Sequence, residues 1–125
     1  MKNELVLSPL GHTWILDLDG TVVKHNGYKS NGEDVLIPGA IDFFESIPDK
    51  DLIVFITSRD ISVKKLTEDF LKEKGIRFDQ IIYNAPYGER ILMNDKKPSG
   101  LKTAYSINTE RDKWCKVELI EDESL

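Results

Sequence analysis

WILDLDGT, residues 14–21, is a short apolar run that ends in two carboxylates, a glycine and a threonine. This order is typical of a buried strand that delivers a reactive site at its carboxyl end. Asp17 and Asp19 are two positions apart, so on a continuing strand both side chains point to one face of the sheet. Neighbouring carboxylates repel each other, and they are tolerated where a cation lies between them or where one holds a proton. The stretch therefore predicts a chemically active site.

The rest of the chain alternates between apolar runs and helical patterns. This alternation implies parallel βαβ units, and therefore an α/β fold with a mainly parallel sheet. A stripe of Val63, Leu66 and Phe70, with Leu71 beside it, predicts the buried face of one helix. The continuous apolar run 52–56 is typical of a strand buried on both faces. The predicted strands cover residues 12–17, 52–56, 78–83, 90–93 and, at an edge, 116–120, and the predicted helices cover residues 40–47, 60–74 and 101–112.

Two segments lack a regular pattern. Residues 1–11 are predicted to form a leading tail or a short strand, and residues 22–37 a loop or small hairpin rich in Gly, Asn, Lys and Asp. His12 is interpreted as a structural residue, because it starts the first strand at the end away from the two aspartates.

Length and composition predict a single domain over residues 1–125. The net charge of -5 argues against sequence-independent binding of nucleic acid, which needs a basic face. No apolar run approaches the roughly 20 residues that span a bilayer, and the first ten residues lack the core of a signal peptide. Cys115 is the only cysteine, so an intrachain disulfide is excluded; we expect a packed side chain there and a cytoplasmic protein.

Polar side chains follow three of the predicted strands at the point where each strand ends. Asp17 and Asp19 end the first strand, residues 57–58 end the second and residues 94–95 end the fourth. In an open parallel sheet, ligands bind in the crevice outside the carboxyl ends of the strands. We therefore expect these three strand ends to converge on one site.

The pentapeptide Asp-Leu-Asp-Gly-Thr, residues 17–21, resembles the first motif of the haloacid dehalogenase (HAD) superfamily of phosphotransferases. The resemblance spans about residues 14–100. It implies a Rossmann-like three-layer sandwich, with gaps between the motifs that leave no room for a cap domain. It also implies that Asp17 attacks phosphorus and that Asp19 serves as general acid and base.

Two further positions match motifs of that family. Thr57 resembles the second motif, whose hydroxyl holds a phosphate oxygen, with Ser58 beside it, although a Thr at a strand end is by itself more often a helix cap. Asp95 resembles the acidic residue of the fourth motif. The resemblance implies a Mg²⁺ ion held by the Asp17 side chain, the Asp19 main-chain carbonyl and the Asp95 carboxylate, the hard oxygen ligands that this ion prefers.

The third motif supplies a basic residue that stabilises the nucleophile and the phosphate. Lys97 is favoured here, because it leaves the active end of the sheet beside Asp95. Lys64, Arg59 and Arg90 stay open as alternatives.

Residues 22–37 lie where members of the family carry a flap over the site. His25, Asn26, Tyr28 and Lys29 would then contact the substrate. The alternative is that these four residues form a solvated tip of the flap.

The tract GERILMNDKKPSGLKTA, residues 88–104, resembles small HAD proteins of bacterial surface-polysaccharide biosynthesis, which suggests a sugar phosphate as substrate. The expected activity is a Mg²⁺-dependent phosphomonoesterase that forms an aspartyl-phosphate at Asp17. Because a capless site is open, a second subunit or a large substrate is expected to exclude water. No nucleic-acid or membrane partner is expected.

Two alternatives belong to other classes. One is a HAD-fold protein with little or no turnover that acts as a binding or regulatory module. The other is a response-regulator receiver domain, but that family places its phosphoacceptor Asp at the end of the third strand, and here the third predicted strand ends in Tyr83 and Asn84. Turnover of phosphate esters with Mg²⁺, compared with that of Asp17→Asn, separates the first alternative from the enzyme.

Overall fold

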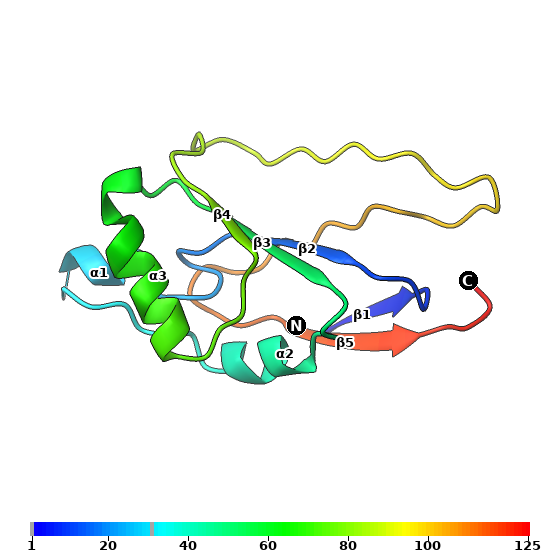
Figure 1. Cartoon of the computed structure of the whole chain (residues 1–125), viewed down its shortest axis with the longest axis horizontal. Coiled ribbons are helices and arrows are strands. Elements are labelled where there is room, and N and C mark those ends of the chain that lie inside the picture. Colours follow the sequence, from blue (N-terminus) through cyan, green and yellow to red (C-terminus); the bar gives the residue numbers. More distant parts are fainter. Residues whose placement is uncertain (1, 31) are drawn as a thin grey trace.

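The computed structural model describes residues 2–30 and 32–125; residues 1 and 31, which belong to the predicted tail and flap, lie outside this description. The described chain is an α/β fold with two small parallel sheets (Figure 1). One sheet has the order β2-β3-β4, and the other pairs β1 with β5. The strands are β1 (Lys2–Leu7), β2 (Thr13–Leu16), β3 (Leu52–Ile56), β4 (Gln80–Ile82) and β5 (Lys116–Glu121). The strands predicted at residues 12–17, 52–56, 78–83 and 116–120 are thus confirmed, with shorter bounds for the first and third.

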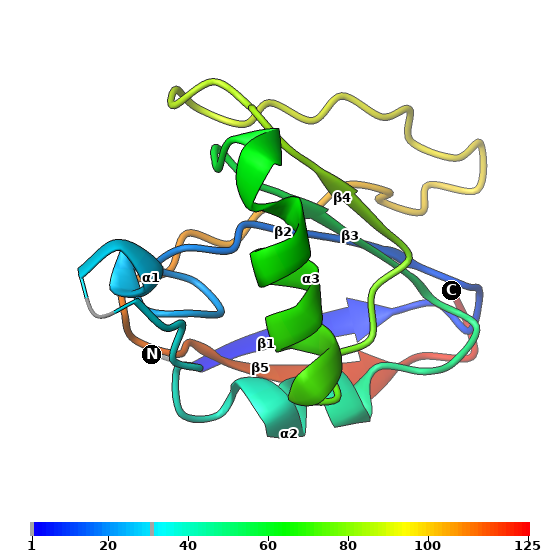
Figure 2. The ribbon, with the colours of Figure 1, turned by 60° about the vertical axis from the view of Figure 1, so that its left-hand side comes forward.

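The two longer helices, α2 and α3, lie on one face of the three-stranded sheet. The helices are α1 (Gly27–Ser30), α2 (Ala40–Ser46) and α3 (Lys64–Glu73), the last preceded by a 3₁₀ turn at Ile61–Val63. Figure 2 shows α3 lying across this sheet, with α2 below it. None of the helices in the described residues is long and apolar enough to cross a bilayer. The helices predicted over residues 40–47 and 60–74 are confirmed.

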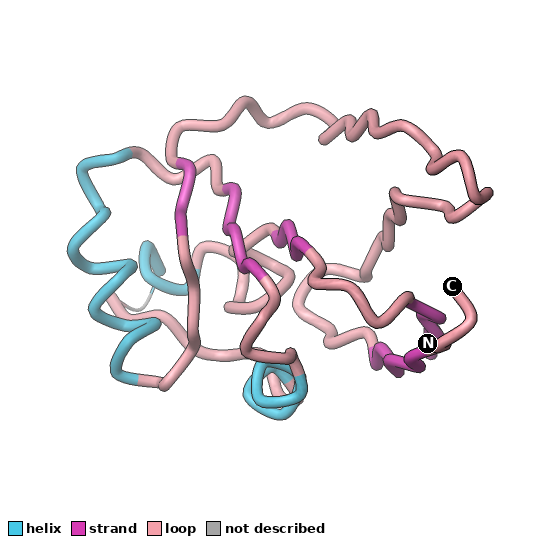
Figure 3. Tube along the Cα trace, turned by 45° about the vertical axis from the view of Figure 1, so that its right-hand side comes forward, coloured by secondary structure: helices cyan, strands magenta, loops and turns pink. Residues whose placement is uncertain are grey.

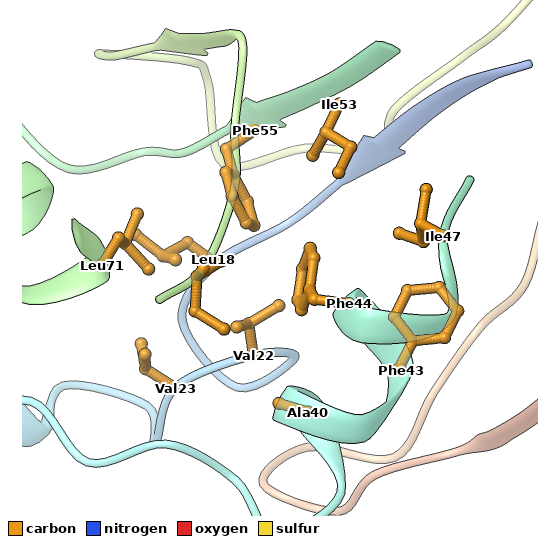
Figure 4. Packing of buried hydrophobic residues seen from close by; sticks show 11 residues of the cluster. Leu18, Val22, Val23, Ala40, Phe43, Phe44, Ile47, Ile53, Phe55 and Leu71 are labelled. Carbon is orange, nitrogen blue, oxygen red and sulfur yellow. The ribbon is translucent and has the colours of Figure 1, made fainter. Parts of the chain in front are cut away.

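The core lies between β3 and the two longer helices, and Figure 4 shows how its side chains meet. Ile53 and Phe55 of β3 point into it, and the Phe55 ring lies 5.8 Å from that of Phe44 in α2. Leu18, between the two aspartates of the motif, is fully buried in the same cluster. Because apolar contacts fix Leu18, the carboxylates on either side of it leave from a rigid turn.

Three predictions about burial are wrong. The first strand was predicted to be buried, but β2 has no buried residue and Ile15 is 49% exposed. Leu52 is 45% exposed, so β3 is not buried on both faces; alternate residues face the helices and the other face stays open. Leu66 in α3 is also exposed, at 43%, whereas Phe70 packs against the core and Leu71 is buried as predicted. The second buried residue of α3 is Thr67, which was not predicted. Thr67 faces inward because its hydroxyl accepts a hydrogen bond from the buried Arg59, a polar contact that an apolar-stripe argument does not include.

The predicted strand at residues 90–93 and the predicted helix at residues 101–112 are also wrong. The chain between Ile82 and Lys116 forms neither helix nor strand, and it extends outside the two sheets as a long loop (Figure 3). Met93 in this loop is 90% exposed. A strand needs a partner for its backbone N–H and C=O groups, and residues 90–93 have none in this conformation. Residues 101–112 contain Ser, Thr, Asn and Ile, which disfavour an unsupported helix.

The leading segment is a strand because a distant segment pairs with it. β1 and β5 run parallel, with Lys2 opposite Lys116 and Leu7 opposite Glu121. Cys115, just before β5, is buried, as expected for a packed side chain. The local pattern of residues 1–11 could not decide between a tail and a strand, because the partner lies more than a hundred positions away in the sequence.

Asp51, in the turn before β3, ties the amino ends of β2 and β3 together. Its buried carboxylate accepts hydrogen bonds from the His12 backbone N–H (3.0 Å) and from Trp14 Nε1 (2.9 Å), and His12 Nδ1 lies 3.0 Å from it. Burial by itself would raise the pKa of Asp51, but hydrogen bonds from Trp14 and His12 outweigh it and hold the pKa below the ordinary value of 3.8. The structural role predicted for His12 is confirmed.

We expect Asp51→Asn to lose about 1–3 kcal/mol of unfolding free energy at neutral pH, because buried donors lose their acceptor. A carboxylate whose pKa is lowered by folding stabilises the protein above its unfolded pKa and loses this effect as the pH falls through the folded pKa. The difference from the wild type should therefore shrink below pH 3.8. Urea denaturation across pH measures it, with Asp49→Asn in the same turn as the exposed control; an equal loss in both variants would contradict the assignment.

Candidate functional site

Asp17 stands at the carboxyl end of β2, directly after its last residue. Its Oδ2 accepts a hydrogen bond from the Thr21 hydroxyl at 3.2 Å, and its Oδ1 lies 3.5 Å from Arg90 Nη1. The same guanidinium nitrogen donates to the Ile56 carbonyl at the end of β3. The Asp17 side chain is 41% exposed, so a solute can reach it. The site at this strand end is an accessible carboxylate with a cation beside it.

Asp19 faces a different partner, because the chain leaves strand geometry after Leu16. The Leu18 carbonyl accepts backbone hydrogen bonds from the three residues 21–23, which closes a tight turn, and Gly20 in that turn has a φ of 85°. Asp19 is then gripped by Arg59, with Nε to Oδ2 and Nη2 to Oδ1 both at 2.9 Å. Asp17 and Asp19 therefore do not face a shared cation in this conformation, contrary to the expectation for a continuing strand.

Arg59 also holds the flap. Its Nη2 donates to Asp34 Oδ1 at 2.7 Å and its Nη1 donates to Asp34 Oδ2 at 3.0 Å and to the Thr67 hydroxyl at 2.9 Å. The Arg59 side chain is 1% exposed and that of Asp34 is 2% exposed. Burial would lower the pKa of Arg59, but hydrogen bonds and charge from Asp19 and Asp34 outweigh it and raise the pKa, so the guanidinium stays charged.

Asp34 was not singled out from the sequence, although one signal was present. Arg and Asp are almost never buried without a charged partner. An arginine directly after a buried strand end, together with an aspartate in a nearby loop, is compatible with such a pair. The partner itself lies 25 positions away, so no local pattern identifies it.

Thr57 and Ser58 lie at the end of β3, as predicted, but their hydroxyls have protein partners. The buried Thr57 Oγ1 accepts a hydrogen bond from the Arg59 backbone N–H at 3.1 Å. Ser58 Oγ donates to the Pro86 carbonyl at 3.4 Å. The next helical turn is capped by Asp60, whose Oδ2 accepts from the Ser62 N–H. The Thr57 hydroxyl thus has a capping-type contact here, and its role in phosphate binding stays a prediction.

Asp95 and Lys97 lie in the exposed loop between β4 and β5. The Asp95 carbonyl accepts from the Thr103 hydroxyl, and the backbone of Lys97 closes a turn with Gly100 and Leu101. Within residues 2–30 and 32–125, no three His, Cys, Asp or Glu side chains are grouped to hold a metal ion. None of the contacts described for Asp95 involves Asp17 or Asp19.

The magnesium site is consequently not assembled in this conformation. Mg²⁺ demands near-ideal octahedral coordination by oxygen. Asp17 instead faces the Arg90 guanidinium, and Asp19 faces Arg59. This donor set does not fit the ion as it stands, so magnesium binding stays a prediction.

Of the four basic candidates for the third motif, two lie at the aspartates. Arg90 is beside Asp17, and Arg59 is paired with Asp19. Lys64 is exposed at the start of α3, and Lys97 lies in the loop. Arg90 is thus the basic residue that this conformation brings to the proposed nucleophile, rather than the favoured Lys97.

The flap lies over the ends of β3 and β4. The Tyr28 ring packs on the Arg59 guanidinium, with 4.1 Å between the ring centroid and Arg59 Cζ. The backbone N–H of His25 donates a hydrogen bond to Asp112 Oδ1. A cleft of about 510 Å³ opens between the flap and the loops that follow the two strands. It is lined by Tyr28, Lys29, Ser58, Arg59, Asp60, Val63 and residues 84–87.

Comparisons of the chain with protein-family models, with curated proteins and with solved structures gave no match. What the fold and the site define is an α/β chain with parallel sheets and an accessible carboxylate at a strand end. The likeness to the HAD superfamily accordingly stays a prediction from the sequence motifs.

Proposed function

We propose that this chain is a Mg²⁺-dependent phosphomonoester hydrolase of the HAD type, a Rossmann-like domain without a cap that acts on a small sugar phosphate. The observation that carries the proposal is the Asp17 carboxylate, which is accessible at the end of a parallel strand and has a guanidinium beside it. A nucleophile aimed at an anionic phosphate needs such a neighbouring cation, because the charges of the two reactants repel.

The reaction has two steps. Asp17 Oδ attacks phosphorus, the bond between phosphorus and the ester oxygen breaks, and Asp19 gives a proton to the leaving alcohol. Water then attacks the aspartyl-phosphate, Asp19 takes its proton and inorganic phosphate leaves. Magnesium, when bound, supplies further positive charge for the phosphate oxygens.

The proposal requires Asp95 to approach Asp17, and three features support such a rearrangement. β2 is at one edge of its sheet, and no described strand pairs with its outer side. The apolar side chains of Ile91 and Met93 in the loop are almost fully exposed. Burying them would stabilise the protein, because it removes apolar surface from water. Arg90 already contacts Asp17. Arg90 is five positions before Asp95, so a turn of the loop toward the free edge of β2 would cover these side chains and bring Asp95 near Asp17 while Arg90 stays in place.

The test is a panel of phosphate esters that includes sugar phosphates, assayed with Mg²⁺ and with EDTA. We expect turnover that EDTA removes, and slower amide exchange in residues 88–104 when Mg²⁺ and orthovanadate, a phosphate mimic, are added. The absence of metal-dependent turnover on every ester would refute the enzyme.

One observation favours a second function, that of a binding module without turnover. Both carboxylate oxygens of Asp19 accept N–H groups of Arg59, so in this conformation Asp19 is engaged in an internal ion pair, as in a structural rather than a catalytic carboxylate. For this function, the ester panel shows no turnover while orthovanadate still slows exchange around Asp17. The same experiment therefore separates the two functions.

We expect Arg90→Gln to lower kcat by about 10²-fold, the scale of losing one donor that stabilises the transition state. Lys97→Gln is the matched control and should change kcat by less than about threefold, since surface substitutions away from the chemistry have small effects. Steady-state kinetics on the best ester of the panel measures both. The reverse order of effects would return the third-motif role to Lys97.

A further inference from the structure

All five N–H donors of Arg59 are used inside the protein. Two go to Asp19, two go to Asp34 and one goes to Thr67. A guanidinium has five such donors and no acceptor. None is left for a phosphate in this conformation, so Arg59 is less suited than Arg90 to the third-motif role. It contacts the proposed acid–base group without contacting the substrate.

We propose that Arg59 is a positioning residue that joins the Asp19 carboxylate and the flap, residues 22–37, into one unit, with Asp34 as the anchor of the flap. The inference deepens the proposed function and rests on it for the role of Asp19. A charge as deeply buried as that of Asp34 is stable only while it is paired. The flap can therefore close with Asp34 inside only when Arg59 is there to receive it.

The flap meets Arg59 through a second contact. The Tyr28 ring lies 4.1 Å from the guanidinium carbon, a cation–π distance. Tyr28 covers the face of the guanidinium, and Asp34 takes two of its edge donors. Opening the flap removes both contacts at once and leaves Asp19 as the only carboxylate that holds Arg59. The orientation of Asp19 and the position of the flap are thus linked, and the linkage must act in both directions.

The first arm of the test needs no turnover. The amides of Lys24 and Ile37 report on the flap, because they donate to the Val35 and Val22 carbonyls. Asp19→Asn should speed their hydrogen exchange about tenfold, within the usual range for linked sites, and Asp34→Asn should do at least the same. Asp69→Asn, which breaks an exposed ion pair on α3, is the matched control with unchanged exchange. Exchange in Asp19→Asn equal to that of the wild type would overturn the linkage.

The second arm uses the best ester of the panel. Asp34→Asn should lower kcat about tenfold with KM within about twofold, because Asp34 acts on the acid–base group through Arg59 and not on the bound substrate. Asp34→Glu, which keeps the charge, should recover part of the loss. A rise in KM with unchanged kcat would overturn the positioning role. If the wild type has no turnover, the proposed function fails, and the exchange arm alone then decides whether Arg59 links Asp19 to the flap.

Discussion

Asp17→Asn is expected to lower kcat by roughly 10⁴-fold or more, the scale of loss when a catalytic nucleophile is removed. An amide at this position cannot form the acyl-phosphate, because it lacks a nucleophilic carboxylate oxygen. The fold should be unaffected, because the side chain is 41% exposed and its one short contact is the Thr21 hydroxyl. Single-turnover assays with the best ester, together with urea denaturation, measure the two quantities separately.

The control for this prediction is Asp69→Asn, the same substitution at an exposed position on α3. It should keep wild-type kcat, and both variants should stay within about 0.5 kcal/mol of the wild-type free energy of unfolding. Retention of more than a tenth of the activity in Asp17→Asn would show that another residue attacks phosphorus.

Arg59→Met is expected to lose about 3–5 kcal/mol of unfolding free energy, the cost of removing one partner from a buried ion pair. Methionine fills a similar length, so the loss comes mainly from charge. The Asp34 carboxylate, 2% exposed, would be left buried without a cation, and the Thr67 hydroxyl and Asp19 would lose donors. Urea denaturation monitored by tryptophan fluorescence measures the loss.

Lys65→Met is the matched control, because Lys65 forms an exposed ion pair with Asp69 on α3. Exposed pairs of this kind contribute little, so this variant should unfold at the same urea concentration as the wild type. Adding Asp34→Leu to Arg59→Met should restore part of the stability, because an apolar pair removes the unpaired charge. Equal losses in Arg59→Met and Lys65→Met would mean that the buried network does not stabilise the fold.

Short-range patterns were sufficient for the elements that form the core. The run Leu52–Ile56 was placed at its observed bounds, and α2 was placed within a residue. In both, a short apolar run marks where the element begins and ends, and in α2 its helical spacing also reports the buried face.

Long-range pairing was beyond those patterns. Residues 90–93 have the apolar composition of a strand but no partner in this conformation, whereas β1, which has a weaker pattern, is a strand because β5 pairs with it. The composition of a segment determines whether it can be a strand. Whether it becomes one depends on a second segment, whose position the local sequence does not contain.

The candidate site divides in the same way. The sequence alone identified Asp17 and Asp19 as an acid pair after an apolar strand, and the order of residues 17–21 suffices for that. Only the tertiary structure identified the partners of these carboxylates. Arg90 contacts Asp17 from 73 positions away in the sequence. Arg59 contacts Asp19 from 40 positions away and Asp34 from 25 positions away. The attraction between two charges depends on their distance in space, which folding sets, and not on their separation along the chain. The local sequence therefore identifies a reactive carboxylate but not the charged residue that pairs with it.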